Sequence, residues 1–147
     1  MKMFAISDMP IARDQLVESL ANEKAGALVT FEGWVRNHNE GRMVERLEYE
    51  AFQPLARAEG EKIIDEAIER YGILAAACVH RVGSLAKGEM AVFVAVTAAH
   101  RAEAFSACRY IIDQVKSRLP IWKKEHYVDG TSGWVNCRSC AHAVPAP

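Results

Sequence analysis

The sequence predicts a single α+β domain with largely antiparallel sheets. Apolar strand segments come in pairs between amphipathic helices, in the order α-β-β-α-β-β-α-β-β, and do not alternate singly with helices as in a parallel sheet. The 147 residues are 50% hydrophobic and 25% charged, which is typical of a globular protein with its own core. A formal net charge of −1 provides no general basic attraction to nucleic acid or to an anionic membrane.

The first half of the chain is predicted to hold two helices flanking a β-hairpin. Both helices show apolar residues at helical spacing, and each is closed by a glycine, Gly26 or Gly72. The strands are β-rich or alternate between apolar and polar residues on either side of a polar turn. In chain order these elements are a helix that starts at 7–10, a strand at 27–35, a turn at 37–41, a strand at 44–52 and a helix at 54–71.

The second half is predicted to hold two strand pairs separated by a long helix. This helix carries a continuous apolar stripe, and Pro120 stops it. In chain order the elements are strands at 73–82 and 90–98 joined by a loop at 83–88, a helix at 100–118, and strands at 121–127 and 134–137. We expect the domain to span residues 1–138 and residues 139–147 to form a C-terminal tail.

Several protein classes are excluded by what the sequence lacks. It contains no dinucleotide-binding glycine motif, no Walker loop, no Gly-x-Ser-x-Gly and no His-Glu-x-x-His. It has no apolar run of transmembrane length and no signal-peptide core at its start. Its four cysteines are irregularly spaced, unlike a secreted disulfide framework. We therefore expect a cytoplasmic protein. Because the net charge is close to zero, any anion would have to bind at a local cluster of basic residues.

The pair His100-Arg101 is the first candidate for an anion site. It begins a predicted helix, where free N–H groups and the helix dipole already favour negative charge. A cation there is electrostatically misplaced unless an anion binds, in which case the dipole and Arg101 act together. The alternative is an exposed polar helix start without function.

Other basic residues lie further along the chain. Lys116 is in the last turn of the same helix, where a cation complements the dipole without any function. Lys123 and Lys124 are neighbours on a predicted strand and point to opposite faces, so at most one shares a pocket with Lys116. Arg36 ends a strand beside a turn, where a surface arginine is also common.

The tail holds a Cys-x-x-C motif formed by Cys137 and Cys140. Together with His142 and His126 it offers up to four zinc ligands. A structural zinc site usually brings two ligand pairs, and a redox Cys-x-x-Cys normally opens a helix after a strand. An incidental pair is therefore the favoured interpretation, and we expect neither a metal nor another cofactor. Cys78 and Cys108 fall on apolar segments and are expected to pack in the core.

A series of short motifs occurs in a fixed order along the chain. The motifs are F-E-G-W-V-R-N at 31–37, L-E-Y-E-A-F at 47–52, H-R-V-G at 80–83, A-H-R at 99–101, P-I-W-K-K-E at 120–125 and G-W-V at 133–135. No single motif is specific, but the set in this order resembles the large, catalytic subunit of molybdopterin synthase over roughly residues 5 to 138. The resemblance implies an α/β-hammerhead-like fold with a small antiparallel β subdomain.

The same resemblance implies a sulfurtransferase of molybdenum cofactor biosynthesis. Its substrate would be cyclic pyranopterin monophosphate, which receives two dithiolene sulfurs and becomes molybdopterin. The sulfur would come from the C-terminal thiocarboxylate of a small ubiquitin-like sulfur-carrier subunit, in a heterotetramer built on a homodimer of this chain. By position, the residues that contact substrate would be Arg36, His100, Arg101, Lys116, Lys123, Lys124, Glu125 and Arg138.

The chemistry of these residue types agrees with that implied function. Arginine and histidine suit a phosphate-bearing substrate, and cations stabilise the negative charge that moves during ring opening and sulfur attack. A lysine in a cationic pocket is suited to proton transfer, so we expect Lys116 and Lys123 to be catalytic, with Lys116 the better proton-transfer candidate. No cysteine nucleophile is needed, because the partner carries the sulfur.

One geometric consequence concerns Arg101 and Lys116. They are fifteen residues apart on one predicted helix, about 22 Å at 1.5 Å per residue, and cannot bind one phosphate within a chain. We therefore expect a homodimer in which His100-Arg101 of one chain completes the pocket of the other. Two alternatives remain: a non-catalytic pterin- or phosphate-binding module, and a sulfur relay using a persulfide on a tail cysteine.

Overall fold

The first of two β-sheets forms the centre of the molecule. The computed structural model describes residues 1–135, and all structural statements refer to them. This sheet has the strand order β1 (Lys2–Ser7), β5 (Ala75–Arg81), β7 (Met90–Ala98) and β2 (Ala27–Trp34). Only the β1–β5 pair is parallel, so the prediction of an α+β fold with largely antiparallel sheets is confirmed.

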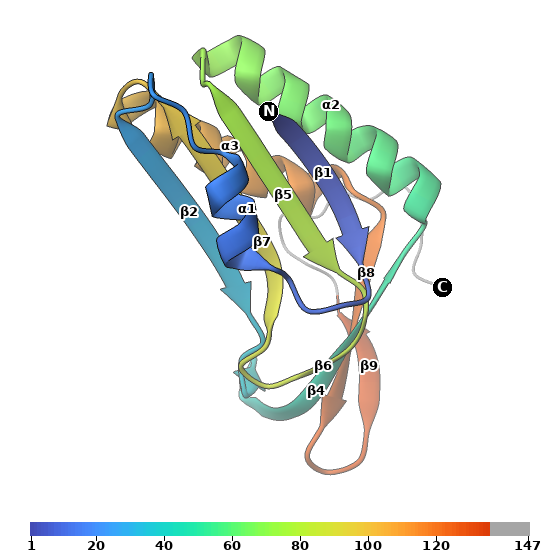
Figure 1. Cartoon of the computed structure of the whole chain (residues 1–147). Coiled ribbons are helices and arrows are strands. Elements are labelled where there is room, and N and C mark those ends of the chain that lie inside the picture. Colours follow the sequence, from blue (N-terminus) through green and yellow to red (C-terminus); the bar gives the residue numbers. More distant parts are fainter. Residues whose placement is uncertain (136–147) are drawn as a thin grey trace.

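The second sheet is antiparallel and extends away from one end of the first, below it in Figure 1. Its long strand β4 pairs with β8 along most of its length and with β6 at the same residues from the other side. The strands are β3 (His38–Asn39), β4 (Arg42–Ala51), β6 (Gly83–Ala86), β8 (Ile121–Tyr127) and β9 (Ser132–Val135). This sheet corresponds to the expected small antiparallel β subdomain.

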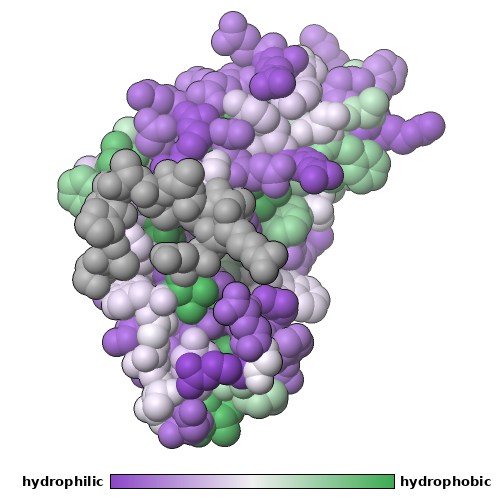
Figure 2. Space-filling model, turned by 180° about the vertical axis from the view of Figure 1, so that it is seen from behind, coloured by the Kyte–Doolittle hydropathy of each residue, from purple (hydrophilic) through white to green (hydrophobic). Residues whose placement is uncertain are grey.

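Three helices cover the first sheet on its two faces. The helices α2 (Gln53–Tyr71) and α3 (Arg101–Arg118) bury their apolar stripes on one face, and α1 (Arg13–Ser19) covers the other (Figure 1). Seen from behind the view of Figure 1, the surface is mostly hydrophilic, with hydrophobic residues scattered among polar ones (Figure 2). Within residues 1–135, none of the helices combines the length and the hydropathy needed to cross a membrane.

The strand β5 shows why the core sits where it does. All seven of its residues, A-A-A-C-V-H-R, are buried, because helices cover both faces of the sheet at this central strand. The C-terminal end of β5 therefore places two ionisable residues, His80 and Arg81, in the protein interior.

The start of the chain differs from the prediction. Residues 2–7 form strand β1, and Ser7 ends it: the Ser7 hydroxyl oxygen accepts a hydrogen bond from the Met9 backbone N–H at 3.0 Å. The prediction of a helix start at 7–10 was therefore wrong, because a serine turn uses the same residue types as a helix N-cap. The first helix begins only at Arg13, and Gly26 lies beyond it, donating its N–H to the Ala98 carbonyl.

Two short strands were predicted as loops. The prediction of a loop over residues 83–88 was wrong because Gly83–Ala86 pairs with β4, a contact with no local sequence signal. The turn at 37–41 includes the two residues of β3, which pair back onto β4 through a tight turn with positive φ at Glu40 and Gly41. The last strand ends at Val135 among the described residues and begins at Ser132, two residues before the prediction.

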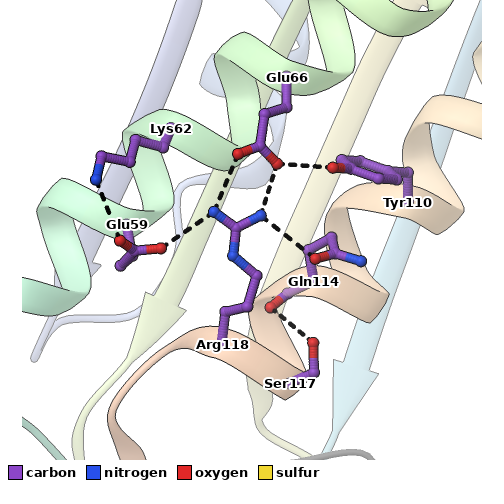
Figure 3. A network of polar contacts seen from close by, with 7 residues as sticks. All are labelled: Glu59, Lys62, Glu66, Tyr110, Gln114, Ser117 and Arg118. Carbon is purple, nitrogen blue, oxygen red and sulfur yellow. Dashed lines mark hydrogen bonds and ion pairs between the residues drawn. The ribbon is translucent and has the colours of Figure 1, made fainter.

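Arg118 links the end of α3 to α2 through hydrogen bonds and ion pairs. Its guanidinium donates to both oxygens of Glu66 at 2.6 and 3.0 Å and to Glu59 at 3.1 Å (Figure 3). Tyr110 donates its hydroxyl to Glu66 at 2.6 Å, and the hydrogen bond from Arg118 lowers the pKa of Glu66. The arginine is thereby assigned a structural role, in contrast to Lys116 two residues earlier.

Replacing Arg118 by alanine is expected to destabilise the fold by roughly 1–3 kcal/mol, because two partly buried carboxylates lose their charge-assisted hydrogen bonds. Urea unfolding would measure the loss. The control is Arg57→Ala, since Arg57 is an exposed arginine of α2 that donates only to Gln53 among the described contacts. Equal losses in the two variants would contradict this structural assignment.

Candidate active site

A pocket of about 150 Å³ opens where the two sheets meet. It brings together segments far apart in the sequence: the end of β2, the β3–β4 hairpin, the ends of β5 and β7, the last turn of α3 and the strand β8. Its lining residues are Gly33, Trp34, Arg36, His38, Leu47, Tyr49, His80, Ala91, Val92, Lys116, Lys123 and Glu125. Four of these, Arg36, Lys116, Lys123 and Glu125, belong to the set expected from the sequence.

Arg36 is held at the pocket through a short polar chain. Its guanidinium lies 3.4 Å from the Asn39 side-chain oxygen, and the Asn39 amide donates to Glu125 at 3.1 Å. Glu125 is only 3% exposed and also accepts the hydroxyl of Tyr127 at 3.1 Å. Because its partners are fixed, this buried carboxylate positions Asn39, and through it Arg36.

The two candidate catalytic lysines reach the pocket from different elements. Lys116 extends from the last turn of α3, and its side chain is exposed. Lys123 lies on β8 opposite Tyr49 of β4. The pocket thus gathers three cationic groups beside one carboxylate, an arrangement that favours binding of a phosphate and stabilises charge developing next to it.

The remaining predicted residues lie elsewhere. His100 and Arg101 are exposed at the N-terminus of α3, and the helix is continuous from Arg101 to Arg118. The separation of about 22 Å between Arg101 and Lys116 therefore holds within one chain. Lys124 points to the opposite face of β8, with its ammonium 5.7 Å from the centre of the Trp134 ring. Arg138 lies outside the described residues.

His80 is a buried histidine at the pocket. It is 7% exposed, packs edge-on against Tyr49, and lies with Nδ1 2.7 Å from the Arg81 carbonyl oxygen. In the neutral ring Nδ1–H donates to that carbonyl, which leaves Nε2 as an acceptor. Burial lowers the pKa of His80 to about 4, and the positive charge of Lys116 contributes in the same direction.

This neutral histidine is expected to make stability fall in acid. As the pH falls below 6.5, the ordinary pKa of histidine, His80 becomes protonated in the unfolded chain. In the folded chain it stays neutral until about pH 4. Stability is therefore fully present above pH 6.5 and lost between 6.5 and 4, by up to about 3 kcal/mol. Urea unfolding of wild type and His80→Gln across this range isolates the effect. Parallel pH profiles for the two proteins would rule it out.

The described cysteines are unsuited to sulfur chemistry. Cys78 and Cys108 are buried free thiols, and burial raises the pKa of both, that of Cys108 to about 11. His126, considered as a zinc ligand, lies with Nε2 2.7 Å from Glu48. Within residues 1–135 no three His, Cys, Asp or Glu side chains gather as a metal site. Cys137, Cys140 and His142 lie outside the described residues.

Comparison with known proteins decides the family. A family model described as MoaE protein matches residues 6–118. The chain belongs to the MoaE family. Proteins named molybdopterin synthase catalytic subunit match most of its length: one from Thermoplasma volcanium is 43% identical over 88% of this chain and 94% of its own, and one from Synechococcus elongatus is 44% identical over 90% and 82%.

Solved structures agree with this membership. Molybdopterin synthase from Staphylococcus aureus superposes with a TM-score of 0.84 at 40% identity, covering 88% of this chain and 94% of that one. A complex of subunits 1 and 2 of molybdopterin-converting factor from Helicobacter pylori matches with a TM-score of 0.75, 20% identity and coverage of 93% and 92%, which supports the fold alone. The resemblance inferred from the short motifs is thereby confirmed.

The MoaE fold also brings residues to the pocket that sequence reasoning did not select. His80 belongs to the H-R-V-G motif at 80–83 but was given no role, because a His-Arg pair before a turn carries no local sign of binding or catalysis. A usable signal did exist, since the apolar run A-A-A-C-V that precedes it predicts a strand buried on both faces. Trp34 and Tyr49 lie within the motifs of the resemblance but were given no role, and both line the pocket.

Proposed function

We propose that this chain is the catalytic subunit of a molybdopterin synthase. It inserts two dithiolene sulfurs into cyclic pyranopterin monophosphate, taking them from the C-terminal thiocarboxylate of a small sulfur-carrier subunit. The observation that carries the proposal is the convergence of Arg36, Lys116 and Lys123, from three separate elements, in one pocket of a MoaE-family chain. We assign this activity to a domain of residues 1–138, followed by a tail of residues 139–147.

The proposed chemistry uses the pocket's charge. Sulfur attack by the thiocarboxylate and opening of the cyclic phosphate both shift negative charge toward oxygen, where fixed cations stabilise it most. Arg36 and Lys123 bind the phosphate in this assignment, and Lys116 transfers a proton to or from the reacting group. Glu125 positions Arg36 through Asn39 and partly offsets the positive charge before substrate arrives.

The site is completed across a dimer in this proposal. His100 and Arg101 lie at the opposite end of α3 from Lys116, so they serve the pocket of a second copy. A two-fold dimer makes both pockets equivalent. The structure of the related Helicobacter pylori protein is described as a complex of two subunits. By analogy, we propose a carrier bound to each protomer, and thus a heterotetramer in a reducing cytoplasm.

Two other functions remain as competitors. A non-catalytic pterin- or phosphate-binding module requires an anion pocket but no proton transfer, so it leaves the placement of Lys116 beside His80 without a role. A persulfide relay requires a reactive thiol, and both described cysteines are buried with raised pKa values. The relay therefore rests on Cys137 or Cys140, and replacing both by serine tests it directly.

The deciding experiment mixes the purified chain with a thiocarboxylated carrier and cyclic pyranopterin monophosphate, without added metal, and assays for the dithiolene. We expect product from wild type and from the Cys137→Ser/Cys140→Ser variant alike. Product from wild type but not from the serine variant would favour the relay. Absence of product, with verified thiocarboxylate and a formed complex, would favour the binding module.

A further inference from the structure

His80 is a buried ionisable residue at the pocket that the proposed chemistry leaves without a role. It shares one row across the first sheet with two other pocket residues: His80 is opposite Val92 of β7, and Val92 is opposite Gly33 of β2. Directly opposed residues point to the same face of a sheet, and Val92 packs in the core with α2 and α3. His80 therefore lines the pocket from the face that carries Lys116.

The hydrogen bond at Nδ1 determines what the other ring nitrogen can do. Nδ1 lies 2.7 Å from the Arg81 carbonyl oxygen, which can only accept, so Nδ1 carries the proton. Burial lowers the pKa of His80 to about 4, and the positive charge of Lys116 acts in the same direction, so the ring is neutral near neutral pH. Nε2 is then an acceptor with no proton to donate.

Nε2 is open to the pocket. Within residues 1–135 the hydrogen bond of the His80 ring is made by Nδ1, and none reaches Nε2. The enclosed side-chain atoms that lack a partner in the same part of the chain are Arg81 Nε and His126 Nε2, so His80 Nε2 is not sealed in the interior. Tyr49 packs against the ring, with centroids 5.0 Å apart, and holds its orientation.

The cationic groups of the pocket have the opposite hydrogen-bonding character. Arg36, Lys116 and Lys123 carry only donors, which suit the acceptor oxygens of a phosphate. Glu125 offers acceptors, but two neighbouring side chains already donate to its Oε1. A fully ionised anion has no donor for Nε2. The ligand that satisfies both kinds of group joins a phosphate to an N–H donor, as a pterin with N–H groups on its ring does.

We propose that His80 is a substrate-binding residue whose Nε2 accepts a hydrogen bond from an N–H group of the pterin, while the cations bind the phosphate. The inference rests on the proposed function and adds how the pocket distinguishes its substrate from other phosphate-bearing molecules. Because His80 and Lys116 line the same face of the pocket, this hydrogen bond also holds the pterin near the proton-transfer group.

The test compares His80→Gln, which keeps a neutral acceptor, with His80→Leu, which removes it. Calorimetry measures Kd for cyclic pyranopterin monophosphate, and competition measures Kd for sulfate, an anion without a donor. We expect His80→Leu to raise Kd for the pterin roughly 5- to 100-fold and His80→Gln to retain most of the affinity. Sulfate is expected to bind equally to all three proteins.

The matched control is His126→Leu, which is expected to leave pterin affinity unchanged. His126 lies two residues after Lys124 on β8, and therefore on the face of this strand that points away from Lys123. Urea unfolding verifies that each variant is folded. A measurement on wild type requires no variant to fold: with ¹⁵N-labelled histidine, the Nε2 resonance of His80 is expected to shift on addition of the pterin and not on addition of sulfate.

Three results would overturn the assignment: unchanged pterin affinity in His80→Leu, equal weakening of pterin and sulfate binding in that variant, or an Nε2 resonance that bound pterin leaves in place. A shift caused by the thiocarboxylated carrier alone, without one caused by the pterin, would give the acceptor to the carrier's tail instead. Wild-type protein that neither binds nor converts the pterin would overturn the proposed function itself, and wild-type calorimetry identifies that result separately.

Discussion

Replacing Lys116 by alanine is expected to lower turnover by roughly 10²- to 10⁴-fold while leaving the fold intact. Lys116 lines the pocket from the last turn of α3, and its exposed side chain contributes little to packing. A positioned proton-transfer group contributes a factor of this size, and its loss falls on kcat more than on substrate affinity. The measurement is single-turnover formation of the dithiolene at saturating thiocarboxylated carrier.

Lys62→Ala provides the control for this variant. Lys62 is another helical lysine, 67% exposed on α2, and its ammonium contacts only Glu59 at 3.4 Å among the described ion pairs. It removes the same side chain away from the pocket and is expected to retain full activity. Near-normal turnover in Lys116→Ala would show that another group moves the proton.

Replacing Arg101 by alanine is expected to reduce kcat/KM by roughly 10- to 100-fold, although Arg101 lies about 22 Å from Lys116 in its own chain. A charge-assisted hydrogen bond to phosphate accounts for an effect of this size. Steady-state kinetics with varied pterin concentration measures it. The control Arg109→Ala removes an exposed arginine of the same helix that pairs only with Asp113 in the described structure. Equal activity in both variants would remove Arg101 from the site.

Local patterns sufficed for the long elements of this fold. The helices observed at 53–71 and 101–118 were predicted at 54–71 and 100–118, because continuous apolar stripes are closed by Gly72, in the left-handed conformation, and by Pro120. The strand β1 was missed because Ser7 forms a turn with residues that also suit a helix start. The strand β6 was missed because only its tertiary pairing with β4 makes it a strand.

The candidate site also combines residues that the sequence predicted with residues that only the tertiary structure reveals. The resemblance supplied Arg36, Lys116, Lys123 and Glu125, and the structure brings these four together. Spacing along a strand was enough to place Lys123 and Lys124 on opposite faces. Burial of His80 at the pocket depends on how the two sheets meet, which no local pattern in a single sequence records.

The central claim is that each pocket combines Lys116 of one protomer with Arg101 of the other. Mixed dimers of Arg101→Ala and Lys116→Ala chains test it most directly. Random mixing makes about half of the dimers mixed, each with one intact pocket and one doubly altered pocket, so activity should recover to about one quarter of wild type. Activity no higher than the average of the two parent variants would contradict a shared site.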